Sequence, residues 1–120
     1  VSVYEVEALE WLNENTKRSS VVMGNVLEGN LISTVAGRVN VLDTSFLYAE
    51  QRYYDSYIVY TTESLYKAGL LLKQYDVDYL YFSEKTKEMY GIEELMYVND
   101  MNCFENVFEN SEVEIYEVVC

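Results

Sequence analysis

Residues 65–83, LYKAGLLLKQYDVDYLYFS, place an amphipathic segment directly before a strand-forming segment, and this order decides the fold. Four side chains in the first part recur at the spacing of one helical face: Leu65, Ala68, Leu72 and Tyr75. Thr62, just upstream, is the predicted N-cap of this helix. Residues 77–82 are rich in β-branched and aromatic side chains and predict a buried strand.

The same alternation of helix and strand extends in both directions. Upstream, the pattern predicts a helix over residues 4–12, a strand over 20–23, a helix over 27–35 with Gly37 as its C-cap, and a strand over 39–42. Downstream, it predicts a short helix capped by Ser83 and ended by Gly91, then a β-hairpin over 104–119 that turns at 109–112. The alternation is imperfect, so the first arm of this hairpin also fits a helix. Residues 46–60 are rich in tyrosine and fit either a helix or irregular structure.

These elements predict one α/β domain spanning residues 1–120. We expect a three-layer, Rossmann-like arrangement with a mainly parallel sheet of about four to five strands and a C-terminal β-hairpin. The first three strands are expected to be parallel, because helices connect them.

The composition excludes several kinds of site. The 120 residues include no histidine, which rules out catalytic triads and imidazole metal sites. Eight basic residues stand against 21 acidic ones, giving a net charge of −13, so a nucleic-acid partner is not expected. We expect no cofactor and no metal site. The acidic side chains form either a solvated surface or a site for calcium or a cationic partner, and residues 76–78 and 99–102 lack the pattern of a calcium-binding loop.

The N-terminus of the sequence carries no signal-peptide pattern. The first residue is Val1 rather than methionine, so we expect a processed or excised piece of a longer protein. No run of 18 apolar residues is present, so this piece is not expected to span a membrane.

In parallel sheets, ligands bind beyond the carboxyl ends of the strands. Here those positions are Gly24, Asp43 and Ser83. Residues 24–29, GNVLEG, contain two glycines five positions apart but lack the following lysine and hydroxyl residue of a phosphate-binding loop. The segment is either a turn that starts a helix or a loop that presents Glu28 to a ligand.

Three further candidates each have a structural alternative. Asp43 either presents a carboxylate or caps the next segment, and Arg38 either pairs with a carboxylate or caps the preceding helix. Arg52 and Asp55, three positions apart among tyrosines, form either a surface ion pair or part of a sugar or partner site.

Cys103 and Cys120 are the two cysteines of the chain. A disulfide between them would close a loop of about 17 residues and contribute roughly 3 kcal/mol. An oxidising compartment leaves both the disulfide and two free thiols open, and in the cytosol we expect two thiols.

The order of several short stretches resembles one protein family. The stretches are ALEWLNENT (8–16), VVMG (21–24), GNLI (29–32), AGRV (36–39), LLLKQYDVDYL (70–80), FENVFEN (104–110) and VEIY (113–116). Together they resemble the C-terminal extracytoplasmic domains of multi-spanning GT-C membrane glycosyltransferases, such as the catalytic subunit of archaeal and bacterial oligosaccharyltransferase. The resemblance covers nearly the whole chain and is carried by the order of the stretches.

The chain departs from that family at its best-known motif. The family's WWDYG motif, which helps to hold the acceptor sequon, corresponds to residues 24–29, where only Gly29 is retained. The resemblance therefore implies no sequon recognition here. The resemblance matches Trp11, Gly29, Arg38 and Asp43 to scaffold positions of the family. It places no catalytic acid on this chain, because the family's catalytic acids lie in membrane-side loops outside it.

The resemblance implies an accessory domain on the extracytoplasmic face of a membrane protein, partnered by the membrane-embedded remainder of the same polypeptide. A glycan or an acceptor peptide is the expected ligand, and the homo-oligomeric state stays open. Two alternatives remain: a free-standing small-molecule-binding module or enzyme with its site at the strand ends, and a structural interaction domain that uses its tyrosines.

Overall fold

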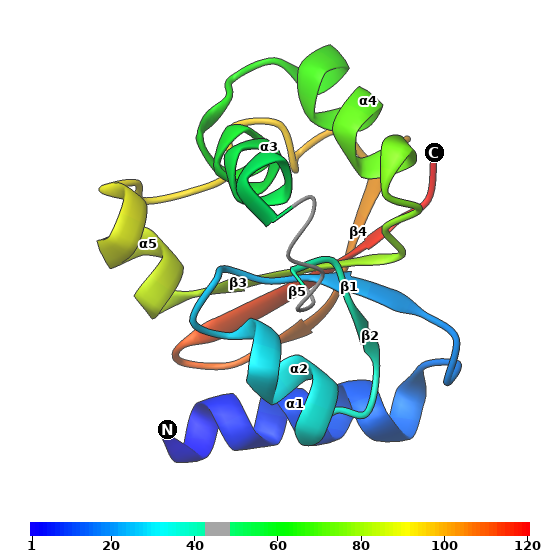
Figure 1. The fold of residues 1–120 in the computed structure, drawn as a ribbon, viewed down its shortest axis with the longest axis vertical. Helices are drawn as coiled ribbons and strands as arrows, with labels where there is room; N and C mark the ends of the chain where they lie inside the picture. Colours follow the sequence, from blue (N-terminus) through cyan, green and yellow to red (C-terminus); the bar gives the residue numbers. More distant parts are fainter. Residues whose placement is uncertain (43–48) are drawn as a thin grey trace.

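The computed structural model describes residues 1–42 and 49–120, which form a mixed α/β domain with helices on both faces of one sheet (Figure 1). The elements are α1 (Val3–Asn15), β1 (Val21–Met23), α2 (Gly29–Thr34), β2 (Val39–Asn40), α3 (Ala49–Thr61), α4 (Leu65–Gln74), β3 (Tyr79–Ser83), α5 (Glu84–Tyr90), β4 (Phe104–Glu109) and β5 (Val113–Val118). The predicted α/β class is confirmed.

The sheet has the strand order β2-β1-β3-β5-β4. β1 pairs in parallel with β2 and β3, as predicted for the first three strands. The predicted C-terminal hairpin is also confirmed, with β4 and β5 antiparallel to each other and β5 antiparallel to β3. The prediction of a mainly parallel sheet was wrong, because the hairpin adds as many antiparallel pairings as there are parallel ones.

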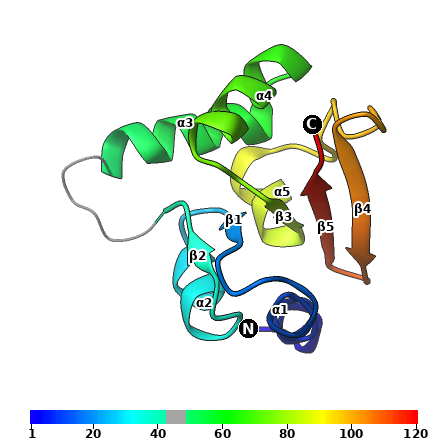
Figure 2. The same cartoon turned by 90° about the vertical axis from the view of Figure 1, so that its right-hand side faces the viewer.

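Two apolar cores lie on opposite faces of this sheet, because successive side chains of a strand point to opposite sides. On β3, Leu80 and Phe82 belong to the core shared with α3 and α4, whereas Tyr81 belongs to the core shared with α1 and α2. Figure 2 shows the two helix pairs on either side of the strands. Each helix pair is therefore fixed by its own buried face.

Serine side chains begin three of the helices. Ser2, Ser64 and Ser83 each accept a hydrogen bond from the backbone amide three residues later, at the starts of α1, α4 and α5. Thr62 was predicted to cap α4, but Ser64 does so, and the Thr62 hydroxyl instead accepts from the Ser64 amide. Gly91 ends α5 with a φ of +66°, as predicted for its C-cap.

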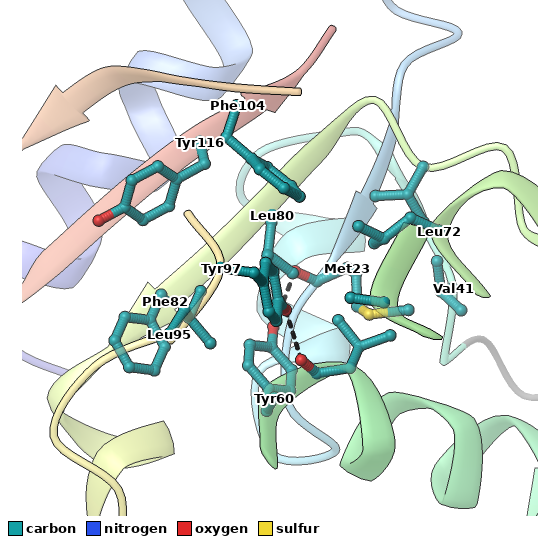
Figure 3. Close-up of a cluster of buried hydrophobic side chains, with 13 residues drawn as sticks. Met23, Val41, Tyr60, Leu72, Leu80, Phe82, Leu95, Tyr97, Phe104 and Tyr116 are labelled. Atoms are coloured by element: carbon teal, nitrogen blue, oxygen red, sulfur yellow. Dashed lines mark hydrogen bonds between the residues drawn. The ribbon is translucent and has the colours of Figure 1, made fainter. Parts of the chain in front are cut away.

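Tyrosine hydroxyls hold α3 against the sheet (Figure 3). Tyr60 is 1% exposed, and its hydroxyl is shared between the carbonyl oxygens of Met23 at 3.0 Å and Tyr81 at 2.7 Å. The Tyr97 hydroxyl, from the segment between α5 and β4, donates to the carbonyl oxygen of Val59 on α3. Residues 49–60, left ambiguous by the sequence, are therefore helical, and their tyrosines supply both apolar bulk and polar anchors.

Candidate functional site

The carboxyl ends of β1 and β3 bring Gly24, Glu28 and Ser83 together, at the edge of the sheet where the sequence predicts a site. Two residues that the sequence analysis missed complete the group, Asn25 and Thr86. We call Asn25, Glu28, Ser83 and Thr86 the carboxyl-edge cluster. All four side chains are at most 3% exposed.

The Glu28 carboxylate is the shared acceptor of three hydrogen bonds in this cluster. Its carboxylate accepts from the backbone amide of Asn25 at 3.0 Å, from the Ser83 hydroxyl, and from the Thr86 hydroxyl at 3.4 Å. These bonds join the β1–α2 turn to the start of α5, two segments far apart in the sequence. The arrangement is therefore a buried hydrogen-bond network that connects these two segments.

The Asn25 side chain supplies the remaining hydrogen bonds of this network. Its side-chain oxygen accepts from the amides of Leu27 at 2.8 Å and Glu28 at 3.0 Å, which shapes the turn after β1. Its side-chain nitrogen donates to the Thr86 hydroxyl at 2.9 Å. An asparagine directly after a strand and a glycine is typical of such a turn, so the sequence did carry a signal for Asn25.

Burial raises the pKa of the Glu28 carboxyl group from 4.5 to about 7, because the charged form loses its hydration. The hydrogen bonds from Ser83 and Asn25 oppose this rise, and the negative charge of Glu5 adds to it. Glu5 is itself buried and pairs with Lys85 at 3.3 Å. Glu28 therefore titrates near neutral pH, as a carboxyl group inside the protein.

The two glycines of residues 24–29 are packed closely against neighbouring side chains. A Cβ atom on Gly24 would lie 2.6 Å from Cδ1 of Ile32, and one on Gly29 would lie 2.3 Å from Nδ2 of Asn40. The segment passes directly from the turn into α2. The contacts support the turn that starts a helix over the ligand-facing loop.

Arg38 is buried and binds backbone carbonyl groups. Its guanidinium group donates to the carbonyl oxygens of Asn13 at 2.7 Å and Thr16 at 2.8 Å, and to the Thr16 hydroxyl at 2.8 Å. It also donates to the carbonyl oxygens of Ala36 and Gly37. Arg38 thus stabilises the C-terminal end of α1, where unpaired carbonyl groups and the helix dipole favour a cation.

Arg52 and Asp55 meet at Tyr75, which comes from the end of α4. The Asp55 carboxylate accepts from the Tyr75 hydroxyl, and the Arg52 guanidinium lies 6.0 Å from the centre of the Tyr75 ring. Arg52 also donates to the carbonyl oxygen of Val41 at 3.0 Å. Arg52 and Asp55 therefore link α3, α4 and the end of β2. The remaining candidate, Asp43, lies outside the described residues.

The structure joins Cys103 and Cys120 in a disulfide, with their Cα atoms 4.3 Å apart.

Within residues 1–42 and 49–120, no group of three or more histidine, cysteine, aspartate or glutamate side chains is arranged to hold a metal ion. In the same residues, no helix has both the length and the apolar character needed to cross a membrane.

Comparisons with known proteins give a match in structure alone. No protein-family model matches the sequence, and no curated protein matches it. Among solved structures, the chain is similar to the C-terminal globular domain of the oligosaccharyltransferase AfAglB-S2 from Archaeoglobus fulgidus, with a TM-score of 0.75 and 16% identity over 98% of each chain. The resemblance predicted from the sequence is confirmed in the fold: this chain has the architecture of an oligosaccharyltransferase C-terminal globular domain.

Proposed function

We propose that this chain is an accessory extracytoplasmic domain of a membrane-embedded glycosyltransferase and is not catalytic by itself. The observation that carries the proposal is the structural match to an oligosaccharyltransferase C-terminal domain along 98% of both chains. The partner is then the membrane-embedded remainder of the same polypeptide. The domain covers the membrane active site or holds a glycan or an acceptor peptide.

The chemistry of the carboxyl edge supports an accessory role. A general acid or base must come within hydrogen-bonding reach of its substrate, whereas Glu28 is 3% exposed and accepts from three internal donors. Arg38, the other buried candidate, directs its donors to backbone carbonyl groups.

We also propose that the domain is a Rossmann-like variant. The parallel order β2-β1-β3 and the helices on both faces support this, and the C-terminal hairpin extends the sheet beyond β3.

The location is tested on the full-length product of the native reading frame. We expect hydrophobic spans upstream of Val1, a product in the membrane fraction, and digestion of this domain by protease added to the outer face. A start codon at Val1 with a product in the soluble fraction would contradict the proposal.

The absence of catalysis is tested on the 120-residue chain. Incubated with a polyprenyl-phosphate-linked sugar and an acceptor peptide, it should give no turnover, while the full-length protein does. Robust turnover by the chain alone would overturn the accessory role and make the carboxyl ends of the strands the candidate active site.

A further inference from the structure

The strand β4 forms one edge of the sheet and has a strand partner on one side only. The strand order ends at β4, and within the described residues the backbone of 105–109 pairs with β5 alone. Figure 2 shows no further helix or strand of the described residues on the outer side of β4. Alternate residues of an edge strand direct their N–H and C=O groups away from the sheet, where another extended chain can pair with them.

The hairpin that contains this edge places like charges directly opposite each other. Glu105 lies opposite Glu117, and Glu109 lies opposite Glu114. Within the described part of the chain, no lysine or arginine forms an ion pair with any of these four carboxylates. Like charges directly opposite each other on neighbouring strands destabilise a sheet. A lysine or arginine brought to each pair from outside would offset that repulsion.

The charge of the sequence around this edge is of one sign. Residues 88–120 contain nine aspartate and glutamate residues and no lysine or arginine, so all eight basic residues lie in the first 87 positions. A field of one sign attracts a partner of the opposite sign. A second copy of this chain would bring its own Glu105 and Glu109 to the same edge, so strand pairing between two copies is disfavoured.

The two acidic pairs lie on opposite faces of the hairpin. Ile115 belongs to the core shared with α1 and α2, and Tyr116 belongs to the core shared with α3 and α4. Because side chains alternate along a strand, Glu117 lies on the face of Ile115 and Glu114 lies on the face of Tyr116. A strand added along β4 therefore meets one acidic pair on each face, and its two cations must be an odd number of positions apart.

We propose that the open edge of β4 binds an extended segment of a partner protein as an added strand, with lysine or arginine side chains on both faces of that segment. The unpaired backbone groups of β4 require an extended occupant, and the four glutamates select a cationic one. An anionic lipid surface would be repelled by the same charges. This inference does not depend on the proposed glycosyltransferase role, because it concerns the C-terminal hairpin and is tested on the chain by itself.

The binding experiment uses fluorescein-labelled peptides of about nine threonine and valine residues with two lysines, a length typical of strands. Fluorescence anisotropy should show saturable binding of peptides whose lysines are an odd number of positions apart, weakened as salt rises. Peptides with an even separation carry both lysines on one face and should bind at least about threefold more weakly, and peptides with glutamate in place of lysine at least about tenfold. If no lysine peptide binds, or if the glutamate peptides bind equally well, the proposal is wrong.

Backbone pairing is tested separately from charge. Two versions of the best peptide are N-methylated at alternate amides, one version at the odd positions and the other at the even positions. Only one set of amides faces β4, so the two versions should differ at least about tenfold in affinity. Hydrogen exchange should show added protection within residues 105–109 when the unmethylated peptide binds. Equal binding of the two methylated versions would show that the peptide does not pair as a strand and would overturn the proposal.

Matched variants locate the binding at the edge. Glu105→Gln combined with Glu109→Gln should weaken binding about tenfold, and it should be at least as stable as the wild type in urea because it removes like-charge pairs. The control pair Glu63→Gln with Glu88→Gln removes the same charge from exposed positions after α3 and on α5, and it should leave binding unchanged.

Equal weakening by the control pair would overturn the assignment to β4. Self-association of the chain with protection of residues 105–109 would make a second copy the occupant, and capture by phosphatidylglycerol vesicles would make it a lipid surface. Either result would overturn the cationic peptide.

Discussion

Glu28 makes the stability of the protein depend on pH in a direction opposite to that of most carboxyl groups. Because burial raises its pKa from 4.5 to about 7, the folded chain holds a proton that the unfolded chain has lost between these values. The free energy of unfolding should therefore fall from pH 5 to pH 8, with a contribution from Glu28 on the order of 3 kcal/mol. Urea denaturation of the wild type and of Glu28→Gln across this range measures it. The difference between the two variants should grow with pH, and parallel curves would show that Glu28 is not the group responsible.

Two positions with positive φ should respond to substitution in opposite directions. Gly91 has a φ of +66° and open space around a Cβ, so Gly91→Ala should lose about 1 kcal/mol through the backbone alone. Asp76, just after α4, has a φ of +53°, so Asp76→Gly should gain about 0.5 kcal/mol by relieving the same conflict. Urea midpoints measure both changes, and a loss on Asp76→Gly would show that the aspartate side chain contributes more than the backbone costs.

The attachment of α1 to the rest of the domain depends on Arg38. Arg38→Lys should lower the free energy of unfolding by about 2 kcal/mol, because an ammonium group cannot reach the carbonyl oxygens of Asn13 and Thr16 together with the Thr16 hydroxyl. Hydrogen exchange should show the loss first in the last turn of α1. Arg18→Lys, an exposed change in the following loop, is the control and should be neutral. A neutral Arg38→Lys would show that these hydrogen bonds add little.

Elements whose signals are local could be predicted from the sequence. α5 needed only Ser83 at one end and Gly91 at the other, and the hairpin needed only a polar turn between two β-prone runs. α3 could not be assigned, because its tyrosine-rich sequence fits irregular structure as well as a helix, and the partners of Tyr60 on β1 and β3 are set only by the fold.

The candidate site shows the same limit across the whole chain. The sequence placed Gly24, Asp43 and Ser83 at one edge because parallel strands end together, and Glu28 in the segment that follows Gly24. It could not show that Glu28 would be buried against Thr86, 58 positions away, since that contact depends on how the strands and α5 pack.

The disulfide is the bond that ties the chain end into the fold as a whole. Cys103, just before β4, packs partly buried against the core beneath α3 and α4, and its bond to Cys120 closes 17 positions of sequence around the hairpin. Closing a loop of that length restricts the unfolded chain, so the Cys103→Ser, Cys120→Ser double variant should lose roughly 3 kcal/mol. Urea denaturation with and without a reductant measures this: the reductant should destabilise the wild type and leave the double variant unchanged. If the reductant has no effect on the wild type, the hairpin is held by its strand pairing and core contacts alone.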